Sequence, residues 1–511
     1  MIASLCVLLV ASPVRAIAFA SGGLGASRAP VTAASTPELG SAADIARFVN
    51  QQRDVLHLPG MAVVVFRDGR QLTSQGFGVA APGGPPVTAR TPFLLGSTSK
   101  QFTGLMVQRL ILDGRLSLDT TVHEVLPWFG TDGDGLSRVT VRELLTHSSG
   151  LSTGAGLTQW GWRVNRADSI EAGARAITQA DVTASPGERF EYSNTNYDIL
   201  GAVIEGVTKQ SYARAFDELV VAPLHLSATT ADLGHPPSGL AAGYYVWLGR
   251  FPAVTPAPQV PSSVPSARIV STASDLARVI QAHLSSSETV PLGSALAAAR
   301  APLLRVNEYS QYASGWWVRP LWELHTGDED PTNASLASCV EHDGQMERSM
   351  SYLLACPSLG LGVVALANAG QGPDSGLWGR FHDGLVHVVL GTPPGTYTPD
   401  LVVRYTTVIV LGVPVVLFLA LVAQARAVRR GRHLVRWSVP ALLLGVGALW
   451  LGYVYAPSRA GDIPVYAMWS SVPDLAMSTI AGTVLTLTSL LVMGVAARMR
   501  APSPDPPREP G

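Results

Sequence analysis

The sequence contains few charged residues and few cysteines. Of its 511 residues, 14% are charged, whereas soluble domains have roughly 25%. The 36 Lys and Arg and the 37 Asp and Glu give a net charge of −1, which excludes a nucleic-acid binder that relies on positive charge. Three cysteines are too few for a disulfide scaffold or a zinc ribbon. We expect no nucleic-acid partner, no metal and no cofactor.

Apolar residues are abundant and gather near the carboxyl end. They make up 47% of the chain, and the mean hydropathy is +0.25, so neither disorder nor a purely soluble protein is expected. Three uncharged stretches each approach the roughly 20 residues that a helix needs to cross a bilayer. They are Tyr405–Ala423, Trp437–Ser458 and Leu475–Ala497. They leave no charged face for water, and predict three transmembrane helices within residues 405–500.

The charges around these stretches predict their orientation. The first loop holds no acid and five arginines: Arg426, Arg429, Arg430, Arg432 and Arg436. By the positive-inside rule, this loop and the tail 501–511 are cytoplasmic. Residues 1–20 combine an apolar run with small residues, typical of a signal peptide, either cleaved or kept as an anchor. We therefore expect a multi-pass protein of the cell membrane with its main domain outside the cytoplasm. The pattern says nothing about a protein partner for the helices.

The main domain is expected at 41–390, between linkers at 21–40 and 391–404. Strand-like runs occur near both of its ends: Met61–Phe66, a run reaching about Val79, Ser351–Ala355 and Leu361–Ala367. Helical spacing occurs in Ser41–Gln52, Gln101–Leu112 and Asp374–Leu390. This pattern predicts an α+β fold, in which an antiparallel sheet assembled from both ends is flanked by helices and carries an inserted helical lobe.

One of the chain's two lysines follows a serine at a spacing that brings the side chains together. Ser97-x-x-Lys100 leads into a helical segment, and residues three apart share a helix face. A serine is a poor nucleophile until a neighbour takes its proton, which a lysine of lowered pKa can do and an arginine cannot. All other basic residues except Lys209 are arginines, so a lysine here indicates a removable proton. An isolated S-x-x-K is nevertheless more often the start of a surface helix.

Two further motifs support a catalytic interpretation. Tyr192-Ser193-Asn194 is a Y-x-N sequence, and His342-Asp343-Gly344 is an H-x-G sequence. With three motifs in this order, the chain resembles the serine β-lactamase and penicillin-binding protein superfamily, specifically its class C branch of D-alanyl-D-alanine peptidases, esterases and aminopeptidases. Supporting segments are Leu58–Gly60, Leu144–Leu151, Ser271–Leu276 and Leu361–Asn368.

The resemblance implies a role for each motif residue. Ser97 attacks a carbonyl carbon and becomes acylated. Lys100 and Tyr192 share the general-base work, with the nearby ammonium making the Tyr192 phenol more acidic. Asn194 holds the substrate beside the bond that breaks. His342, which stands where the family more often has Lys, passes a proton or binds a carboxylate.

The resemblance also implies an oxyanion hole. Its donors are the backbone N–H groups of Ser97 and Gln345, and Gly344 leaves room for the substrate. A second H-x-G sequence, His325-Thr326-Gly327, lies in a loop-like composition and is not favoured. His147 is expected to be a structural or helix-end histidine.

Two features near His342 bear on substrate and fold. Asp343 stands where the family usually has Thr or Ser. If its side chain faced the pocket, it would disfavour carboxylate-bearing substrates such as β-lactams and stem peptides. Cys339 and Cys356 are evenly spaced about the expected turn after His342. They either bridge the two strands or remain buried free thiols.

These observations predict a membrane-tethered extracytoplasmic serine hydrolase that forms an acyl-enzyme on amide or ester bonds. The favoured substrates are peptidoglycan-type peptides. Carboxylesterase or β-lactamase activity at the same site is the first alternative. The second is a non-catalytic, penicillin-binding-like sensor domain whose helices recruit a partner.

Overall fold

The computed structural model describes residues 40–131, 135–158, 169–255, 260–285, 290–321, 323, 337–346, 348–370 and 376–394, with scattered helical residues between 412 and 426 and between 477 and 488. The predicted signal peptide, nearly all of both linkers, the tail and most of the predicted transmembrane region lie outside the described residues. So does the second H-x-G sequence at His325. Among the described residues, no helix combines the length and the apolar character needed to cross a membrane.

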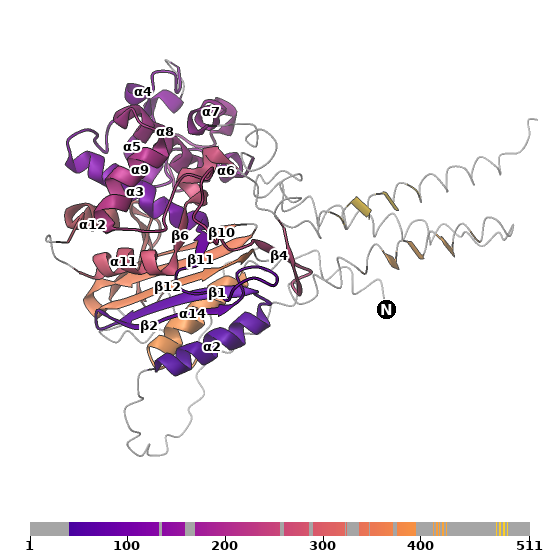
Figure 1. Cartoon of the computed structure of the whole chain (residues 1–511). Helices are drawn as coiled ribbons and strands as arrows, with labels where there is room; N and C mark the ends of the chain where they lie inside the picture. The colour runs from indigo at the N-terminus through magenta and orange to yellow at the C-terminus, as the bar shows by residue number, and fades with distance from the viewer. Residues whose placement is uncertain are drawn as a thin grey trace, which may run out of the picture. The chain divides into compact units, whose positions relative to one another are not determined.

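An antiparallel sheet forms the centre of the domain (Figure 1). Its strands, in spatial order, are β2 (Arg70–Gly78), β1 (Gly60–Arg67), β12 (Leu361–Ala367), β11 (Ser349–Cys356), β10 (Ser338–Met346), β9 (Trp317–Pro320), β8 (Gln311–Tyr312) and β7 (Leu304–Arg305). Strands from both ends of the domain meet where β1 pairs with β12, from Met61 opposite Ala367 to Phe66 opposite Gly362. This confirms the predicted α+β sheet built from the two ends.

The apolar run of β1 is continuous because both faces of the sheet are covered. Met61, Val63 and Val65 pack in one apolar cluster with α2 (Ala42–Val55) and α14 (Gly376–Val389). The alternate side chains of the strand, including Val64, belong to a second cluster on the opposite face. Side chains of a strand point alternately to its two faces, so a single strand contributes to two cores.

Local signals fix the first elements as the sequence predicts. Ser41 caps α2 in a reciprocal capping box with Asp44. The turn between β1 and β2 has Asp68 at φ 50° and Gly69 at φ 71°, the left-handed pair that a tight two-residue hairpin requires. These two residues therefore allow β1 and β2 to form a hairpin.

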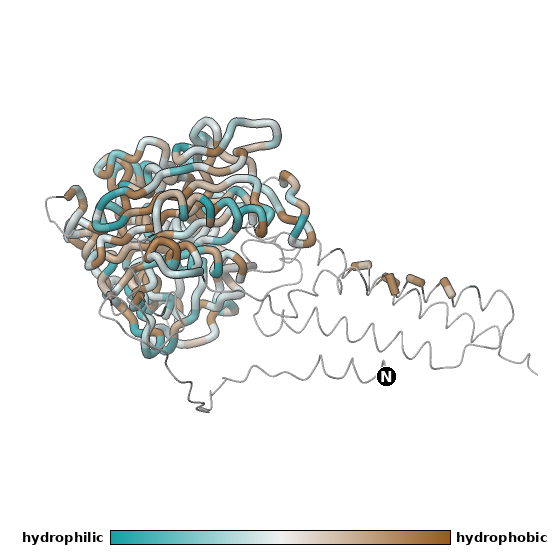
Figure 2. The backbone as a smooth tube through the Cα atoms, turned by 90° about the horizontal axis from the view of Figure 1, so that it is seen from below, coloured by the Kyte–Doolittle hydropathy of each residue, from teal (hydrophilic) through white to brown (hydrophobic). Residues whose placement is uncertain are grey.

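The second face of the sheet carries α11 (Ala273–Leu284) and the helical lobe above it (Figure 1). The helices of the lobe are α3 (Ser99–Leu112), α4 (Val122–Val125), α5 (Val141–Leu145), α6 (Thr153–Thr158), α7 (Ile170–Arg175), α8 (Asn194–Thr208), α9 (Tyr212–Phe216), α10 (Ala222–Leu224) and α12 (Gly293–Arg300). Two short sheets complete the fold: β3 (Pro92–Leu94) with β6 (Val270–Thr272), and β13 (Ala369–Gly370) with β4 (Tyr244–Trp247) and β5 (Phe251–Val254). Figure 2 shows apolar and polar residues interleaved along the backbone of this body.

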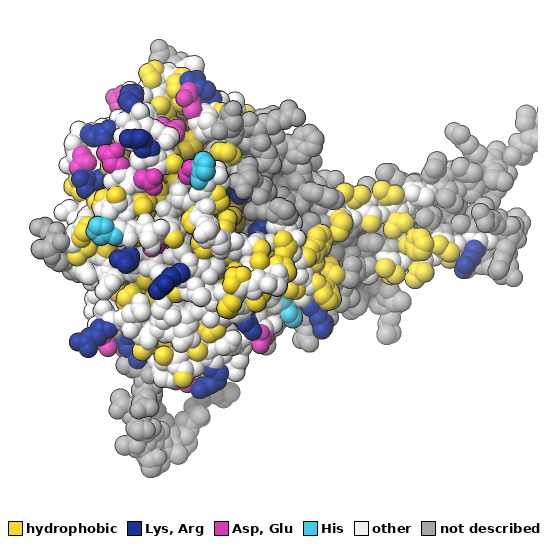
Figure 3. Space-filling model, viewed as in Figure 1, with side chains coloured by type: hydrophobic (Ala, Val, Ile, Leu, Met, Phe, Trp, Pro, Cys, Tyr) yellow, Lys and Arg dark blue, Asp and Glu magenta, His cyan; other side chains and the backbone are white. Residues whose placement is uncertain are grey.

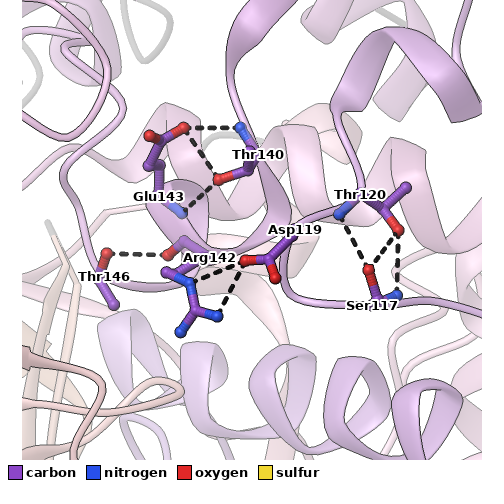
Figure 4. Close-up of polar contacts among 7 residues, drawn as sticks. All are labelled: Ser117, Asp119, Thr120, Thr140, Arg142, Glu143 and Thr146. Atoms are coloured by element: carbon purple, nitrogen blue, oxygen red, sulfur yellow. Dashed lines mark hydrogen bonds and ion pairs between the residues drawn. The ribbon is translucent and has the colours of Figure 1, made fainter.

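The short helix α5 is held at its start by side-chain caps (Figure 4). The backbone N–H of Thr140 donates to the Glu143 carboxylate at 2.7 Å, and the Glu143 N–H donates back to the Thr140 hydroxyl at 3.3 Å. Arg142 on the same helix pairs with Asp119 at 2.9 Å. These contacts matter because a five-residue helix has little stability of its own.

The two cysteines near His342 form a disulfide. Cys339 on β10 and Cys356 on β11 lie at adjacent strand positions with a Cα–Cα distance of 4.3 Å, and both are fully buried. This favours the bridge over the free thiols. It also ties the strand that carries His342 to the centre of the sheet.

The disulfide closes a loop with a sequence separation of 17 residues. We expect the double variant Cys339→Ala, Cys356→Ala to lose about 3 kcal/mol of unfolding free energy, because the open chain gains conformational entropy. Denaturant unfolding under non-reducing conditions measures this, with Cys6→Ala as the matched control. Alkylation of two thiols in the unreduced wild-type domain would contradict the bridge.

Candidate active site

Ser97 lies at the junction of a turn and a helix, facing the edge of the sheet. A single helical turn, η1 (Gly96–Thr98), leads directly into α3. The turn begins at Gly96, whose φ of 61° suits glycine and few other residues. The Ser97 side chain is partly exposed, while Lys100 on the first turn of α3 is fully buried. The predicted pairing of Ser97 with Lys100 is present at 3.1 Å.

The Lys100 amine has three oxygen partners. It lies 3.1 Å from the Ser97 hydroxyl, 2.6 Å from the Asn194 side-chain oxygen and 2.9 Å from the Ser266 carbonyl oxygen. An ammonium has three N–H donors, so all three are used. Asn194 and Ser266 offer oxygens that can only accept, whereas Ser97 also carries a proton. When Lys100 loses a proton, the amide and carbonyl oxygens retain the two remaining N–H groups, and the lone pair faces Ser97.

Burial makes that proton easy to lose. Burial lowers the pKa of Lys100 to about 7, although the charges of Asp198 and Asp343 act to raise it. Burial removes the hydration that stabilises the charge of an ammonium, and this loss costs the neutral amine much less. Lys100 therefore has the position and the protonation equilibrium of a general base for Ser97.

Tyr192 lies beside the same amine, but its acidity differs from the expectation. The Lys100 nitrogen is 5.0 Å from the centre of the Tyr192 ring. Burial nevertheless raises the pKa of Tyr192 above its ordinary value, and the hydrogen bond with Ser97 offsets only part of this rise. The expectation of a more acidic phenol is therefore wrong. With its pKa raised, Tyr192 is suited to donate a proton, and Lys100, with its pKa lowered, is better suited to accept one.

The backbone around Gly344 lies against Ser97 as an oxyanion hole requires. A Cβ on Gly344 would be 3.0 Å from the backbone nitrogen of Ser97 and would overlap the carbonyl oxygen of Leu95. A Cβ on Gly96 would be 3.0 Å from the backbone nitrogen of Gln345. The two predicted N–H donors thus lie on segments in van der Waals contact, and glycine on each side permits the approach.

His342 is buried on β10, and both of its ring nitrogens have partners. Nδ1 lies against the backbone oxygen of Asp343, and Nε2 is 3.3 Å from the Tyr312 hydroxyl. Burial lowers the pKa of His342 to about 4, the charge of Asp343 acts to raise it, and Lys100 lowers it further. The ring is therefore uncharged at neutral pH and offers no cation to a carboxylate.

The side chain of Asp343 turns to the other face of the strand. It accepts a hydrogen bond from Gln345, two residues on, at 3.2 Å. Residues two apart share a face of a strand, opposite to that of His342 and Gly344. Its charge still acts on Lys100, Tyr192 and His342.

Three residues of the site lie outside the three sequence motifs. Asp198 is buried one turn after Asn194 on α8, and the helical spacing of four could have indicated it. Burial raises the pKa of Asp198 to about 7, and the charge of Lys100 acts against this rise. Ser266 acts through its carbonyl group, for which a sequence has no signal. Tyr312 is brought in by the fold alone.

Comparisons with known proteins agree with this geometry. The family model described as "Beta-lactamase" matches residues 32–383, more than half of the chain. The chain belongs to the beta-lactamase family. Penicillin-binding protein 4 of Amycolatopsis lactamdurans is 30% identical over 364 residues, which cover 67% of this chain and 88% of that protein. Protein flp of Staphylococcus aureus is 28% identical over 329 residues, and the chain spans 60% of its length.

Solved structures of the beta-lactamase family share the fold. The octameric penicillin-binding protein homologue of Pyrococcus abyssi superposes with a TM-score of 0.59 at 23% identity, covering 72% of this chain and 81% of that one. EstCE1, a hydrolase with promiscuous acyltransferase activity, gives a TM-score of 0.57 at 23% identity over 68% of this chain and 97% of its own. At these identities the solved structures show a shared fold, which agrees with the family match and with the similarity to a penicillin-binding protein.

The ionisation of Lys100 predicts the pH dependence of Ser97 reactivity. Only the neutral amine accepts the serine proton, so the second-order rate of labelling by a fluorophosphonate should rise with pH and level off above about 7. Lys100→Arg should slow labelling by roughly 10²–10⁴-fold, because an arginine does not give up its proton. Lys209→Arg, at the only other lysine, is the matched control. A labelling rate that does not fall on the acid side of neutrality would contradict this base.

Proposed function

We propose that the protein is an extracytoplasmic serine hydrolase that cleaves ester or amide bonds through an acyl-enzyme on Ser97. The observation that carries the proposal is the environment of Lys100. Its buried amine has two acceptor-only oxygens for its own N–H groups and Ser97 as the one partner with a proton to give. That arrangement activates a serine.

In the first step, the Ser97 oxygen forms a bond to the carbonyl carbon and its proton passes to the Lys100 amine. The carbonyl oxygen becomes an oxyanion, which accepts hydrogen bonds from the backbone N–H groups of Ser97 and Gln345. The Asn194 side-chain oxygen accepts from Lys100 at 2.6 Å, which holds Asn194 beside the base.

In the second step, the bond from the carbonyl carbon to the leaving group breaks. The leaving group takes the Tyr192 proton, and Lys100 returns a proton to the phenolate. The Lys100 ammonium gives its proton to the Tyr192 phenolate because the pKa of Tyr192 is raised, whereas the pKa of Lys100 is lowered to about 7. The proton lost by Ser97 thus ends on the leaving group. Water then attacks the acyl-enzyme, and Ser97 regains a proton as the acid is released.

Two substrate classes follow from different observations. Peptidoglycan-type peptides are supported by the similarity to a penicillin-binding protein and by the proposed location. Uncharged esters or amides are supported by the site itself, because burial lowers the pKa of His342 to about 4 and leaves the ring neutral, whereas the Asp343 side chain lies on the other face of the strand. A stem peptide with a free terminal carboxylate would meet no cation at His342.

The membrane tether is part of the proposal. It rests on the three apolar stretches and the arginine-rich first loop. The described residues within the first and third stretches are helical and expose large apolar side chains: Val415, Val416, Phe418, Leu419, Met477, Ile480 and Val484. Figure 3 colours hydrophobic side chains yellow, and they gather on the described residues outside the domain. Apolar side chains on an exposed helix surface are typical of contact with lipid. The Cys339–Cys356 bridge suits an oxidising compartment.

Covalent labelling tests the acyl-enzyme. Full-length protein in detergent is incubated with a fluorophosphonate, with an uncharged p-nitrophenyl ester and with a penicillin, and intact mass is measured. We expect the fluorophosphonate adduct and ester turnover in the wild type and neither in Ser97→Ala.

The control for this experiment is Ser74→Ala, at an exposed serine on β2. A penicillin adduct would favour peptidoglycan-type substrates, and ester turnover without an adduct would favour uncharged ones. Folded protein that reacts with none of the three reagents would overturn the enzyme and leave the sensor domain.

The proposed topology predicts which engineered thiols are accessible. In a Cys6→Ala background, Gly461→Cys in the second loop should react with a membrane-impermeant maleimide on intact cells. Arg430→Cys in the first loop should react only after the cells are opened. Equal labelling of both positions on intact cells would contradict three membrane crossings.

A further inference from the structure

Three buried rings form a row from the interior to the active site: His147, Tyr312 and His342. The Tyr312 hydroxyl lies 3.2 Å from Nε2 of His147 and 3.3 Å from Nε2 of His342. All three side chains are at most 2% exposed. The His147 ring also packs on Tyr192, with ring centres 4.3 Å apart. The row therefore lies directly behind the residues that surround Ser97.

The end of the row at the site has a fixed hydrogen-bond direction. Nδ1 of His342 faces the backbone oxygen of Asp343, which can only accept. Nδ1 therefore carries the proton. In an uncharged imidazole the other nitrogen then has a lone pair, so Nε2 of His342 accepts from Tyr312.

His147, at the inner end of the row, independently gives the same direction of hydrogen bonding. Nδ1 of His147 lies 3.3 Å from the backbone nitrogen of Ser193 and 3.1 Å from the side-chain nitrogen of Asn196. A backbone N–H can only donate, so Nδ1 of His147 is the acceptor. Its proton is then on Nε2, which donates to the Tyr312 oxygen. Tyr312 accepts from one histidine and donates to the other, as a hydroxyl can.

A second acceptor lies near Tyr312 but fits the row less well. The Tyr197 hydroxyl acts electrostatically on Tyr312 and donates its own proton to the Leu145 carbonyl oxygen at 2.9 Å. If Tyr312 gave its proton to Tyr197, its lone pairs would face the lone pair of His342 across 3.3 Å. Two buried acceptors without a donor are unfavourable. The assignment of the Tyr312 proton to His342 leaves every group satisfied.

We propose that Tyr312 and His147 are positioning residues that hold His342 as an uncharged ring with its proton on Nδ1, so that the site selects acyl substrates without a carboxylate at this position. The claim about substrate selection rests on the proposed function of the site. The claim about Tyr312 and His147 concerns only the positions of protons in the folded protein. Both nitrogens of His342 are used within the protein, so the ring has no N–H to offer to a substrate.

The surroundings of His342 favour the same state. Burial lowers the pKa of His147 well below its usual value, and Lys100 and His342 add to this effect. The charged or titratable groups that face His342 or the row from the packed elements are Lys100, Tyr192, Tyr197, Asp198, Arg319, Glu341 and Asp343. Asp343 is the group that acts to raise the pKa of His342, and burial outweighs it.

The tautomers can be read directly by NMR without any substrate. Full-length protein labelled with ¹⁵N in histidine alone is measured in detergent at neutral pH, and His342→Gln and His147→Gln assign the two rings. We expect Nδ1–H for His342 and Nε2–H for His147. A charged ring or Nε2–H at His342 overturns the proposal even if the enzyme is active. The result does not depend on catalysis, so it is separate from failure of the proposed function.

The Tyr312→Phe variant tests the consequence for specificity. Without the donor at Nε2, His342 should become easier to protonate and free to bind an anion. We expect the ratio of penicillin acylation to uncharged-ester acylation to rise about tenfold at mildly acidic pH, which corresponds to a pKa change of about one unit. Tyr309→Phe, at an exposed tyrosine near β8, is the matched control. An unchanged ratio and an unchanged His342 spectrum in Tyr312→Phe overturn the role of Tyr312.

Discussion

The burial of a single amine determines much of this structure. Lys100 is fully buried, and an ammonium in that position is stable only if fixed oxygens replace its water. Those oxygens come from three separate parts of the chain: the turn before α3, the start of α8 and the segment that ends at Arg268. The lobe must therefore be assembled accurately around one nitrogen. The same burial that demands these partners also lowers the pKa that makes the amine a base.

A second constraint is the close approach of β10 to the turn that carries Ser97. Gly344 and Gly96 face each other, and a side chain on either would collide with backbone of the other segment or its neighbours. β9 pairs with β10 only from Ser338 to Glu341, and no strand of the described chain continues beside His342–Met346 on that edge. Along His342–Met346 the strand is thus paired on one side by β11 and unpaired on the other. An open edge next to a nucleophile is a suitable place for substrate backbone and oxyanion to bind.

Sequence reasoning predicted the parts of this architecture that depend on short-range chemistry. The meeting of Ser97 with Lys100 follows from two residues three positions apart at the start of a helix. The pairing of strands from the two ends also followed from pattern, because both runs are apolar throughout. The raised pKa of Tyr192 could not be predicted from the sequence, because it depends on how far the folded lobe excludes water. Tyr312 and the Ser266 carbonyl could not be found either, because only the three-dimensional fold brings them to His342 and Lys100.

The position of β1 between β2 and β12 has a consequence for how the molecule is made. Its neighbours are β2, which follows immediately, and β12, some 300 residues later in the chain. A growing chain can form the first hairpin at once but cannot cover the other edge of β1 until β12 is synthesised. Ser97 meets Gly344 and Gln345 only after the same late strands arrive. Folding of such long-range pairings is slow, and the nucleophile has no oxyanion hole until the process is complete. The site is thus incomplete until the late strands have been synthesised, and a chain that ends before β10 lacks Gly344 and Gln345.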